Sequence, residues 1–450
     1  MKSPARWVVL FFTIILPTML SAQGIVFEQG SWADAVKKAK KQKKLLFLHL
    51  DKPDCGGCSE VASVAFNSPL IREKFGVNFI SFRTDGTTGI GKELADKLEV
   101  ECVPSSVFVD TDEYPLARFC GTTSLDRAYL EKAEEAINKN RELPMKSLVE
   151  SYEKGDRSPA LLRRYMDRRR EMGLSTTDLL TEYVRQLPAD SLRLGAVLRF
   201  VFEQGPVVGS KADSVFRSYY PRTDSLYRAV GLKKAIELNA LIMNNSIKKA
   251  VKDKDSRLAY RTATWRQRTY TNDYKAGAMA YDWVMLRYYR GVQDTLRYLP
   301  MAVRYYDQHF MPAKVDSIQN LDNLENQRRM RGVMPAQTSP QRPGMGIMSF
   351  MANPNTQRYV SALNQAAWEF YEMTRDTVYL NKALQWSKRT LEYREDPSSM
   401  DTYAHILYRL GRKEEALTWQ EKAVKLERER NSPLLKGLQT SLDKMQAGTL

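Results

Sequence analysis

The sequence contains few of the residues that build metal centres or disulfide frameworks, with 4 cysteines and 3 histidines in 450 residues. All of the cysteines, Cys55, Cys58, Cys102 and Cys120, lie in one segment near the N-terminus. The chain as a whole is therefore not a disulfide-stapled scaffold. Cys102 and Cys120 also lack the paired spacing of a zinc site. We expect no metal ion and no other cofactor.

Long apolar runs are missing beyond the N-terminus. Lys2 and Arg6 precede the apolar run 7–16, and small residues follow up to Ala22. This pattern predicts a signal peptide, residues 1–22, cleaved after Ala22. The alternative is an uncleaved anchor, but the apolar core is short for a membrane span. No cysteine follows Ala22, which argues against a lipoprotein. We therefore expect a periplasmic or secreted protein of a Gram-negative bacterium.

The net charge of +16 is unevenly distributed. Acidic side chains slightly outnumber basic ones in residues 25–140, so the excess positive charge belongs to residues 141–450. In an exported protein, such a surface favours an acidic protein or an anionic surface as partner over a nucleic acid. The alternative interpretation is a set of solvated helix faces.

Residues 25–140 alternate between strand and helix patterns. The apolar run 45–50 is too short for a typical helix and predicts a strand buried on both faces. The pattern further predicts helices near 32–42, 61–66, 91–98 and 125–137, and strands at 77–82, 107–109 and 116–120, of which the last two form a hairpin.

A Cys-x-x-Cys motif, Cys55-Gly56-Gly57-Cys58, lies between the first predicted strand and the helix that follows. In this context the first cysteine lies against the unpaired N–H groups and the positive dipole end of a helix. Both favour the thiolate, which is the nucleophile of disulfide exchange. The motif therefore indicates a redox-active dithiol.

Three features together resemble the thioredoxin-fold family: the Cys-x-x-Cys motif, the segment 98–104 that ends in Pro104, and Gly121 after the last predicted strand. The run 64–69 is closer to the exported thioredoxin-like subfamilies than to thioredoxin itself. The resemblance covers the whole of residues 25–140. It implies an α/β thioredoxin-like N-terminal domain.

The resemblance also implies roles for single residues. Cys55 would be the attacking thiolate and Cys58 the resolving thiol. Pro104, in the cis form, would present the Val103 backbone to a substrate strand. His49 stands where many thioredoxins keep a buried acid, so it could act as a base near neutral pH. The alternative for His49 is a core histidine bonded to the backbone.

The motif departs from the family pattern in two places. Asp54 replaces the tryptophan that commonly precedes the first cysteine. A carboxylate there disfavours the Cys55 thiolate, whereas Lys52 favours it. Gly56 and Gly57 are poor helix formers and cost about 1 kcal/mol each relative to alanine. Both departures favour the alternative of a vestigial, non-catalytic domain.

Cys102 and Cys120 lie near Pro104 and at the end of the last predicted strand. In a thioredoxin fold these positions are close to one another and to the dithiol. They form either a second disulfide or auxiliary thiol pair, or two buried free cysteines that fill core space.

Almost all of the remaining chain has helical periodicity. We expect a helical array over 145–310 with helices at 159–170, 176–186, 191–203, 211–227, 232–251, 258–270, 276–289 and 294–309. Small residues then recur with an offset of 33, which resembles two tetratricopeptide repeats at about 364–397 and 398–431, within 356–446. Such repeats present a surface to other proteins, and His309 and His405 inside helices are expected to be structural.

A segment rich in Met, Pro and Gly, residues 331–355, separates the array from the repeats and predicts a linker or loop. Met345, Met348 and Met351 recur every third residue. Thioethers bind copper(I), but no cysteine or histidine joins them, so a flexible apolar linker is the preferred interpretation.

The sequence thus predicts an exported thiol–disulfide oxidoreductase that acts on protein thiols or disulfides and is served by a redox partner protein. The helical domain would recruit these partners. The alternative, from a different class, is a non-catalytic binding or assembly scaffold.

Overall fold

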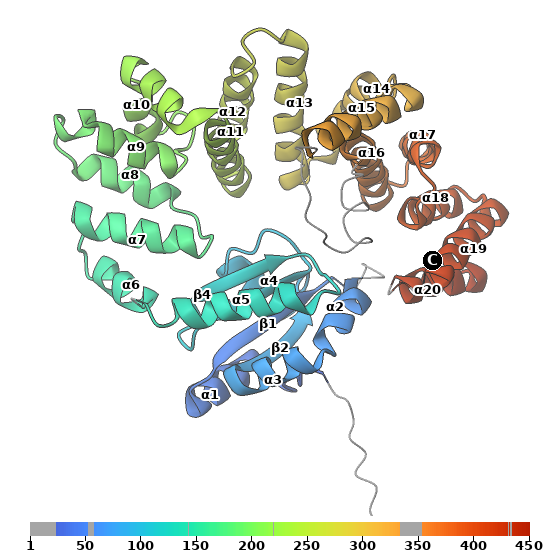
Figure 1. The fold of residues 1–450 in the computed structure, drawn as a ribbon, viewed down its shortest axis with the longest axis horizontal. Coiled ribbons are helices and arrows are strands. Elements are labelled where there is room, and N and C mark those ends of the chain that lie inside the picture. The colour runs from blue at the N-terminus through green and yellow to red at the C-terminus, as the bar shows by residue number, and fades with distance from the viewer. Residues whose placement is uncertain are drawn as a thin grey trace, which may run out of the picture.

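The computed structural model describes residues 24–52, 58–142, 144–218, 220–333, 353–430, 432 and 434–450. It contains a mixed sheet with helices on both faces, followed by an all-helical region (Figure 1). This is the predicted fold class.

The sheet has four strands in the order β2-β1-β3-β4. Their bounds are β1 Leu45–Asp51, β2 Phe79–Asp85, β3 Ser105–Val109 and β4 Pro115–Cys120. Strand β1 pairs parallel with β2 and antiparallel with β3, and β3 forms an antiparallel hairpin with β4. Because β1 is central, residues 45–50 are buried on both faces, as the apolar run predicts.

Alternate side chains of β1 serve two separate cores. Leu46, Leu48 and Leu50 pack under α1 and α4, whereas Leu45 and Phe47 pack under α2, α3 and α5. The bounds are α1 Trp32–Gln42, α2 Cys58–Phe66, α3 Pro69–Asn78, α4 Gly89–Lys97 and α5 Asp126–Lys139. The sheet is therefore the middle layer of a three-layer domain.

Helix α3 was not expected, and the predicted strand 77–82 was wrong at its start. Residues 77 and 78 end α3, and the strand begins at Phe79. Pro69 at the first helical turn preorganises this helix. Ile71 and Phe75, four residues apart, then bury the same helix face. The aromatic and β-branched residues beside Phe79 favour a strand by their local propensity. The burial of Ile71 and Phe75 nevertheless keeps residues 77 and 78 in the helix.

The helical region begins directly after α5. Its first part contains α6 Met145–Glu153, α7 Pro159–Glu171, α8 Thr177–Gln186, the 3-10 turn η1 Ser191–Arg193, α9 Gly195–Glu203, α10 Lys211–Arg217, α11 Tyr220–Lys252, α12 Ser256–Arg268, α13 Tyr274–Gly291, α14 Thr295–His309 and α15 Val315–Val333. The predicted helix 191–203 is split, because Leu194 adopts an extended conformation. Helix α15 lies outside the array boundary of 310 that the sequence suggested.

The C-terminal part consists of α16 Pro354–Met373, α17 Thr377–Tyr393, α18 Pro397–Arg409, α19 Lys413–Glu429 and α20 Leu435–Ala447. The recurring small residues Ala383, Ala416 and Ala423 are fully buried between these helices. This arrangement is compatible with the predicted repeats. Residues 334–352, with Met345, Met348 and Met351, lie outside the described residues.

The helices from α6 to α20 follow one another in an arc that returns to α2 (Figure 1). Within the part of the chain that the structure describes, no helix combines the length and the apolar character needed to cross a bilayer. The predicted signal peptide, residues 1–22, lies outside that part.

Candidate functional site

One end of the sheet brings together the segments that carry the predicted site. We call it the Pro104 edge and define it by Asp51, Gly86, the Val103–Pro104 bond, Gly121 and the start of α2 at Cys58. The Val103–Pro104 bond is cis. Pro104 is buried, and its carbonyl accepts a hydrogen bond of 2.9 Å from the Gly121 N–H. The end of β4 is thereby held beside the proline.

A close packing contact fixes Val103 against the ends of β1 and β2. A Cβ atom on Gly86 would lie 2.9 Å from both Leu50 Cβ and Val103 Cγ1, closer than such atoms approach. Only glycine therefore permits this approach of the β2 loop. The Gly86 N–H also donates to the Asp51 carbonyl at 2.8 Å.

Cys58 is the first residue of α2 and is half-buried. It takes part in a disulfide, and none of the cysteines in the described part of the chain is a free thiol. Cys55 and its neighbours Asp54, Gly56 and Gly57 lie outside the described residues. The attacking role of Cys55 therefore stays a prediction.

His49 lies on the same face of the sheet as α2 and is completely buried. Its ring packs edge-on against Phe66, with the ring centroids 5.0 Å apart. The Nδ1 atom is 2.9 Å from Ser106 Oγ, and Nε2 is 3.4 Å from Asp51 Oδ1. Ser106 is directly opposite His49 in the β1–β3 register. The partners are therefore side chains, not the backbone groups of the structural alternative.

Asp51 lies between the buried His49 ring and the guanidinium group of Arg83, and it contacts both. Arg83 on β2 donates two hydrogen bonds to the Asp51 carboxylate. One runs from Nε to Oδ2, and the other, 2.9 Å long, from Nη2 to Oδ1. Burial alone would raise the pKa of Asp51, but hydrogen bonds and charge from His49 and Arg83 outweigh it. The pKa of this carboxyl is thus held well below its usual range.

Sequence reasoning identified His49 but missed Asp51, Arg83 and Ser106. The signal for Asp51 was present, since it stands two residues after His49 on one strand and therefore shares its face. Arg83 and Ser106 come from other strands. Their positions depend on strand register, which one sequence does not specify.

Cys102 and Cys120 form a disulfide with a Cα–Cα distance of 5.9 Å. Cys102 is half-buried and Cys120 is exposed, so the alternative of two buried free cysteines was wrong. The bridge joins the loop before Pro104 to the end of β4. It therefore lies on the rim of the Pro104 edge. A redox role for the pair stays a prediction.

The helical region also holds the loop before Pro104. Glu99 forms an ion pair with Arg169 of α7 and accepts a 2.6 Å hydrogen bond from the Ser175 N–H. From inside the sheet domain, Arg118 donates to the carbonyls of Glu99 at 2.8 Å and Leu98 at 3.1 Å. The loop is thus fixed from both sides.

Two more ion pairs connect the Pro104 edge to later helices. Lys52, just after β1, has its Nζ 3.5 Å from Glu372 Oε1 of α16. Glu101 pairs with Lys248 of α11. The helical arc therefore contacts the Pro104 edge at two places, Lys52 and Glu101.

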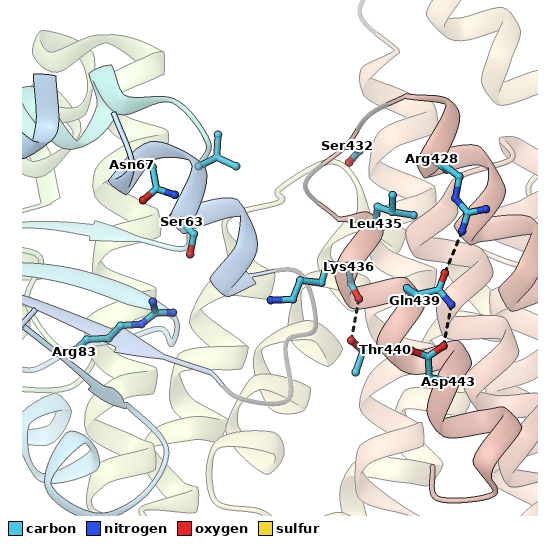
Figure 2. Close-up of a pocket in the computed structure, with 11 residues that line it drawn as sticks. Ser63, Asn67, Arg83, Arg428, Ser432, Leu435, Lys436, Gln439, Thr440 and Asp443 are labelled. Carbon is cyan, nitrogen blue, oxygen red and sulfur yellow. Dashed lines mark hydrogen bonds between the residues drawn. The ribbon is translucent and has the colours of Figure 1, made fainter. Parts of the chain in front are cut away.

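A cleft of about 850 Å³ lies where the arc returns to the sheet domain. Figure 2 shows Ser63, Asn67 and Arg83 on one wall, facing Lys436 and Gln439 on the other. Arg83 thus joins this cleft to the Asp51–His49 pair.

Among the described residues there is no group of three or more His, Cys, Asp or Glu side chains that could hold a metal ion. His405, which was expected to be structural, has its Nδ1 2.8 Å from the Asp401 carbonyl and packs against Trp368.

Comparison with known proteins locates the fold. The model of a family described as thioredoxin-like domains matches residues 32–134. No curated protein matches the chain. Solved structures also resemble part of it, and two of them are described here. The first is a proposed disulphide-isomerase from Bacteroides thetaiotaomicron, with 25% sequence identity, a TM-score of 0.23 and coverage of 27% of this chain and 98% of that one.

The second structure, titled DsbH oxidoreductase, has 20% identity and a TM-score of 0.22, and the match covers 26% of this chain and 89% of that one. Both matches cover only about a quarter of this chain. The family model and the mixed sheet with its surrounding helices identify residues 32–134 as a thioredoxin-like domain, which an all-α region follows.

Proposed function

We propose that the protein is an exported thiol–disulfide oxidoreductase that acts on protein substrates through Cys55 and Cys58. The observation that carries this proposal is the position of Cys58 at the start of α2, at the same end of the sheet as Val103 and Pro104. That end of the sheet would place a substrate strand beside the sulfur atoms.

The chemistry consists of two exchange steps. The Cys55 thiolate attacks a substrate disulfide, forms a mixed disulfide and expels one substrate thiolate. The Cys58 thiolate then attacks the Cys55 sulfur, which leaves Cys55–Cys58 oxidised and the second substrate sulfur as a thiolate. Two electrons pass to the substrate, and a redox partner protein restores the dithiol. The same steps in reverse oxidise a substrate dithiol.

His49 is proposed as the group that accepts the Cys58 proton in the second step. It is buried below α2, and contacts with Ser106 and Asp51 orient its ring. An oriented imidazole next to a carboxylate is a suitable proton acceptor. Asp51 acts here through His49 and is a positioning residue.

Insulin reduction by the full chain tests the proposal. Replacement Cys55→Ser removes the nucleophile, so we expect the rate to fall to that of the uncatalysed reductant. Substantial remaining activity would overturn the mechanism. Matched replacement of an exposed residue on the far helix α12, Arg257→Ser, is expected to leave the rate unchanged.

A second candidate is a scaffold that binds partners without turnover. One observation favours it: Lys52 and Glu101 beside the site both pair with helical residues, as they would at a permanent interface. The variant Cys58→Ala discriminates, since an oxidoreductase accumulates mixed disulfides with Cys55, whereas a scaffold traps none.

A further inference from the structure

The cleft of about 850 Å³ in Figure 2 is bounded by helix faces that lie far apart in the sequence. One wall belongs to α2 of the sheet domain, with Arg83 of β2 beside it. The other wall belongs to α19 and α20, at the end of the helical arc. A cleft of this volume is comparable with the pockets of about 300–1,000 Å³ that bury drug-sized ligands. It is therefore large enough to hold a short polypeptide segment.

The charged side chains that line the cleft are mostly positive. Among the lining residues that the structure describes, Arg83, Arg428 and Lys436 are cations, and Asp443 is a carboxylate. Asp51 accepts two hydrogen bonds from Arg83 and so offsets the charge of that guanidinium group. The excess positive charge of the cleft therefore comes from the wall that α19 and α20 form.

Arg428 on this wall contacts a neutral side chain. Its Nη2 donates to Gln439 Oε1 at 3.3 Å, and Gln439 Nε2 donates to Asp443 Oδ1 at 2.9 Å. The Gln439 amide thus lies between the guanidinium group and the carboxylate (Figure 2). Within the ranges that the structure describes, no carboxylate forms an ion pair with Arg428. Because a guanidinium group can bind a carboxylate through two parallel hydrogen bonds, an incoming carboxylate would give Arg428 a stronger contact than Gln439 does.

Apolar side chains lie beside these cations on both walls. Val64 of α2 is 51% exposed, and Leu435 at the start of α20 is half-buried. A polypeptide segment can present acidic and apolar side chains together, which matches this lining. An anionic bilayer is flat and cannot reach both walls of a cleft, and a polysaccharide carries no apolar side chains. Both the charge and the apolar surface of the cleft therefore favour an acidic polypeptide.

We propose that this cleft binds an acidic segment of a partner polypeptide, an inference that rests on the proposed function only for the identity of that partner as protein substrate or redox partner protein. A carboxylate of the segment would bind Arg428, and its apolar side chains would pack on Val64 and Leu435. Because Val64 lies on the helix that begins at Cys58, the segment would hold the partner beside the helix of the predicted dithiol.

Binding of a cysteine-free peptide to the full chain tests the cleft separately from the dithiol. The probe is a peptide of alternating glutamate and leucine, and its companion has glutamine in place of glutamate. Isothermal titration calorimetry gives the dissociation constant of each peptide. We expect the acidic peptide to bind at least about tenfold more tightly, because hydrogen bonds between charged groups are stronger than those to a neutral amide.

Two variants, one on each wall, locate the bound peptide. Arg428→Glu reverses the charge of the proposed contact and should weaken binding of the acidic peptide about tenfold or more. Val64→Glu places a carboxylate on the opposite wall and should also weaken it severalfold. Both side chains are exposed, so the variants should fold. The matched controls are Lys388→Glu on α17 and Val77→Glu on α3, which are also exposed and should leave the dissociation constant unchanged.

Each contrary result has a separate meaning. Equal affinity for the two peptides, or binding that neither wall variant weakens, would overturn the cleft proposal and leave the proposed function intact, since the probe has no thiol. An effect of Arg428→Glu alone would place the peptide on one wall only and would overturn a two-walled site.

Tighter binding of heparin than of the acidic peptide, abolished by Arg428→Glu, would assign the cleft to an anionic polysaccharide and overturn the polypeptide proposal. Peptide binding that depends on both walls, in a protein that fails to reduce insulin, would support the cleft and overturn the proposed function alone.

Discussion

The structure controls the charge of Asp51 through two neighbouring side chains. Arg83 binds both of its carboxylate oxygens, and the His49 ring faces it from the buried side. Because these groups favour the ionised form, the folded protein holds the pKa of Asp51 below its usual range. Folding stability from this carboxylate is therefore complete above the unfolded pKa of about 3.9 and is lost as the pH falls below it.

The replacement Asp51→Asn should destabilise the protein by about 2 kcal/mol at pH 7, because hydrogen bonds to a charged group contribute roughly this much. Urea unfolding measures the loss. The difference from the unmodified protein should shrink when the pH falls below about 4, where the carboxylate of the unfolded chain is protonated. Asp96→Asn, an exposed residue of α4, is the control. A loss that is equally large at low pH would contradict the charge argument.

His49 permits a prediction about catalysis instead of stability. If His49 accepts the Cys58 proton, His49→Ala should slow insulin reduction by about tenfold or more and change the shape of its pH profile. Ser106→Ala is the informative companion, since it removes only the Nδ1 partner and should give a smaller loss with the profile kept. An unchanged profile in His49→Ala would remove the proton-transfer role.

For single residues, the sequence predicted best those positions that depend only on neighbours along the chain. The position of His49 relative to Cys55 and the alternation along β1 follow from one segment of chain. Ser106, which contacts His49, comes from β3, and Arg83, which binds Asp51, comes from β2. Their approach depends on which strands pair and in which register. Such contacts are long-range, so local patterns do not predict them.

At the scale of elements, the loop from Leu98 to Pro104 is held by distant parts of the chain. The Cys102–Cys120 bridge encloses a sequence separation of 18 residues. In the chain-entropy model, closing a loop of this length stabilises the folded state by about 3 kcal/mol. The double variant Cys102→Ser with Cys120→Ser should therefore lower the free energy of unfolding by about this amount.

Thermal or urea unfolding measures that change, and mass spectrometry after alkylation without reduction first establishes that the bridge is present. If the bridge only stabilises the loop, the double variant keeps its reaction with free dithionitrobenzoate. An unchanged unfolding free energy, with the bridge present in the parent protein, would contradict the prediction.

Element boundaries show where local patterns fail. Val77 has strand-forming character, but it and Asn78 belong to α3, because Ile71 and Phe75 bury that helix against the sheet. The predicted helix 211–227 was wrong, since α10 ends at Arg217, whereas the predicted interruption between 227 and 232 is confirmed at Gly231, whose φ is 76°. Tertiary packing overrides propensity in the first case. At Gly231, glycine permits a backbone conformation that interrupts the helix.

At the scale of the whole molecule, the apolar clusters do not follow the domain boundary that the sequence suggested. Composition suggested a boundary between 140 and 145, where the thioredoxin-like segment gives way to helices. One apolar cluster nevertheless extends from Phe47 in the sheet through Tyr129 and Leu162 to Ile242 in α11. A second cluster covers residues from Val207 to Met445. The sheet and the first helices therefore share a core, which indicates that they unfold together.

Hydrogen exchange with two matched variants tests this division. Leu162 in α7 and Leu407 in α18 are both fully buried, one in each cluster. Replacing a buried leucine by alanine costs about 2–5 kcal/mol. Leu162→Ala should therefore speed exchange of amides in β1 and α5 as well as in its own helix, since a shared core opens as one unit. Leu407→Ala should leave β1 and α5 unchanged. If Leu162→Ala affected only α6 to α8, the boundary suggested by composition would be the physical one, and the first helices would be a separate unit attached to the sheet domain by surface contacts such as the Arg169–Glu99 ion pair.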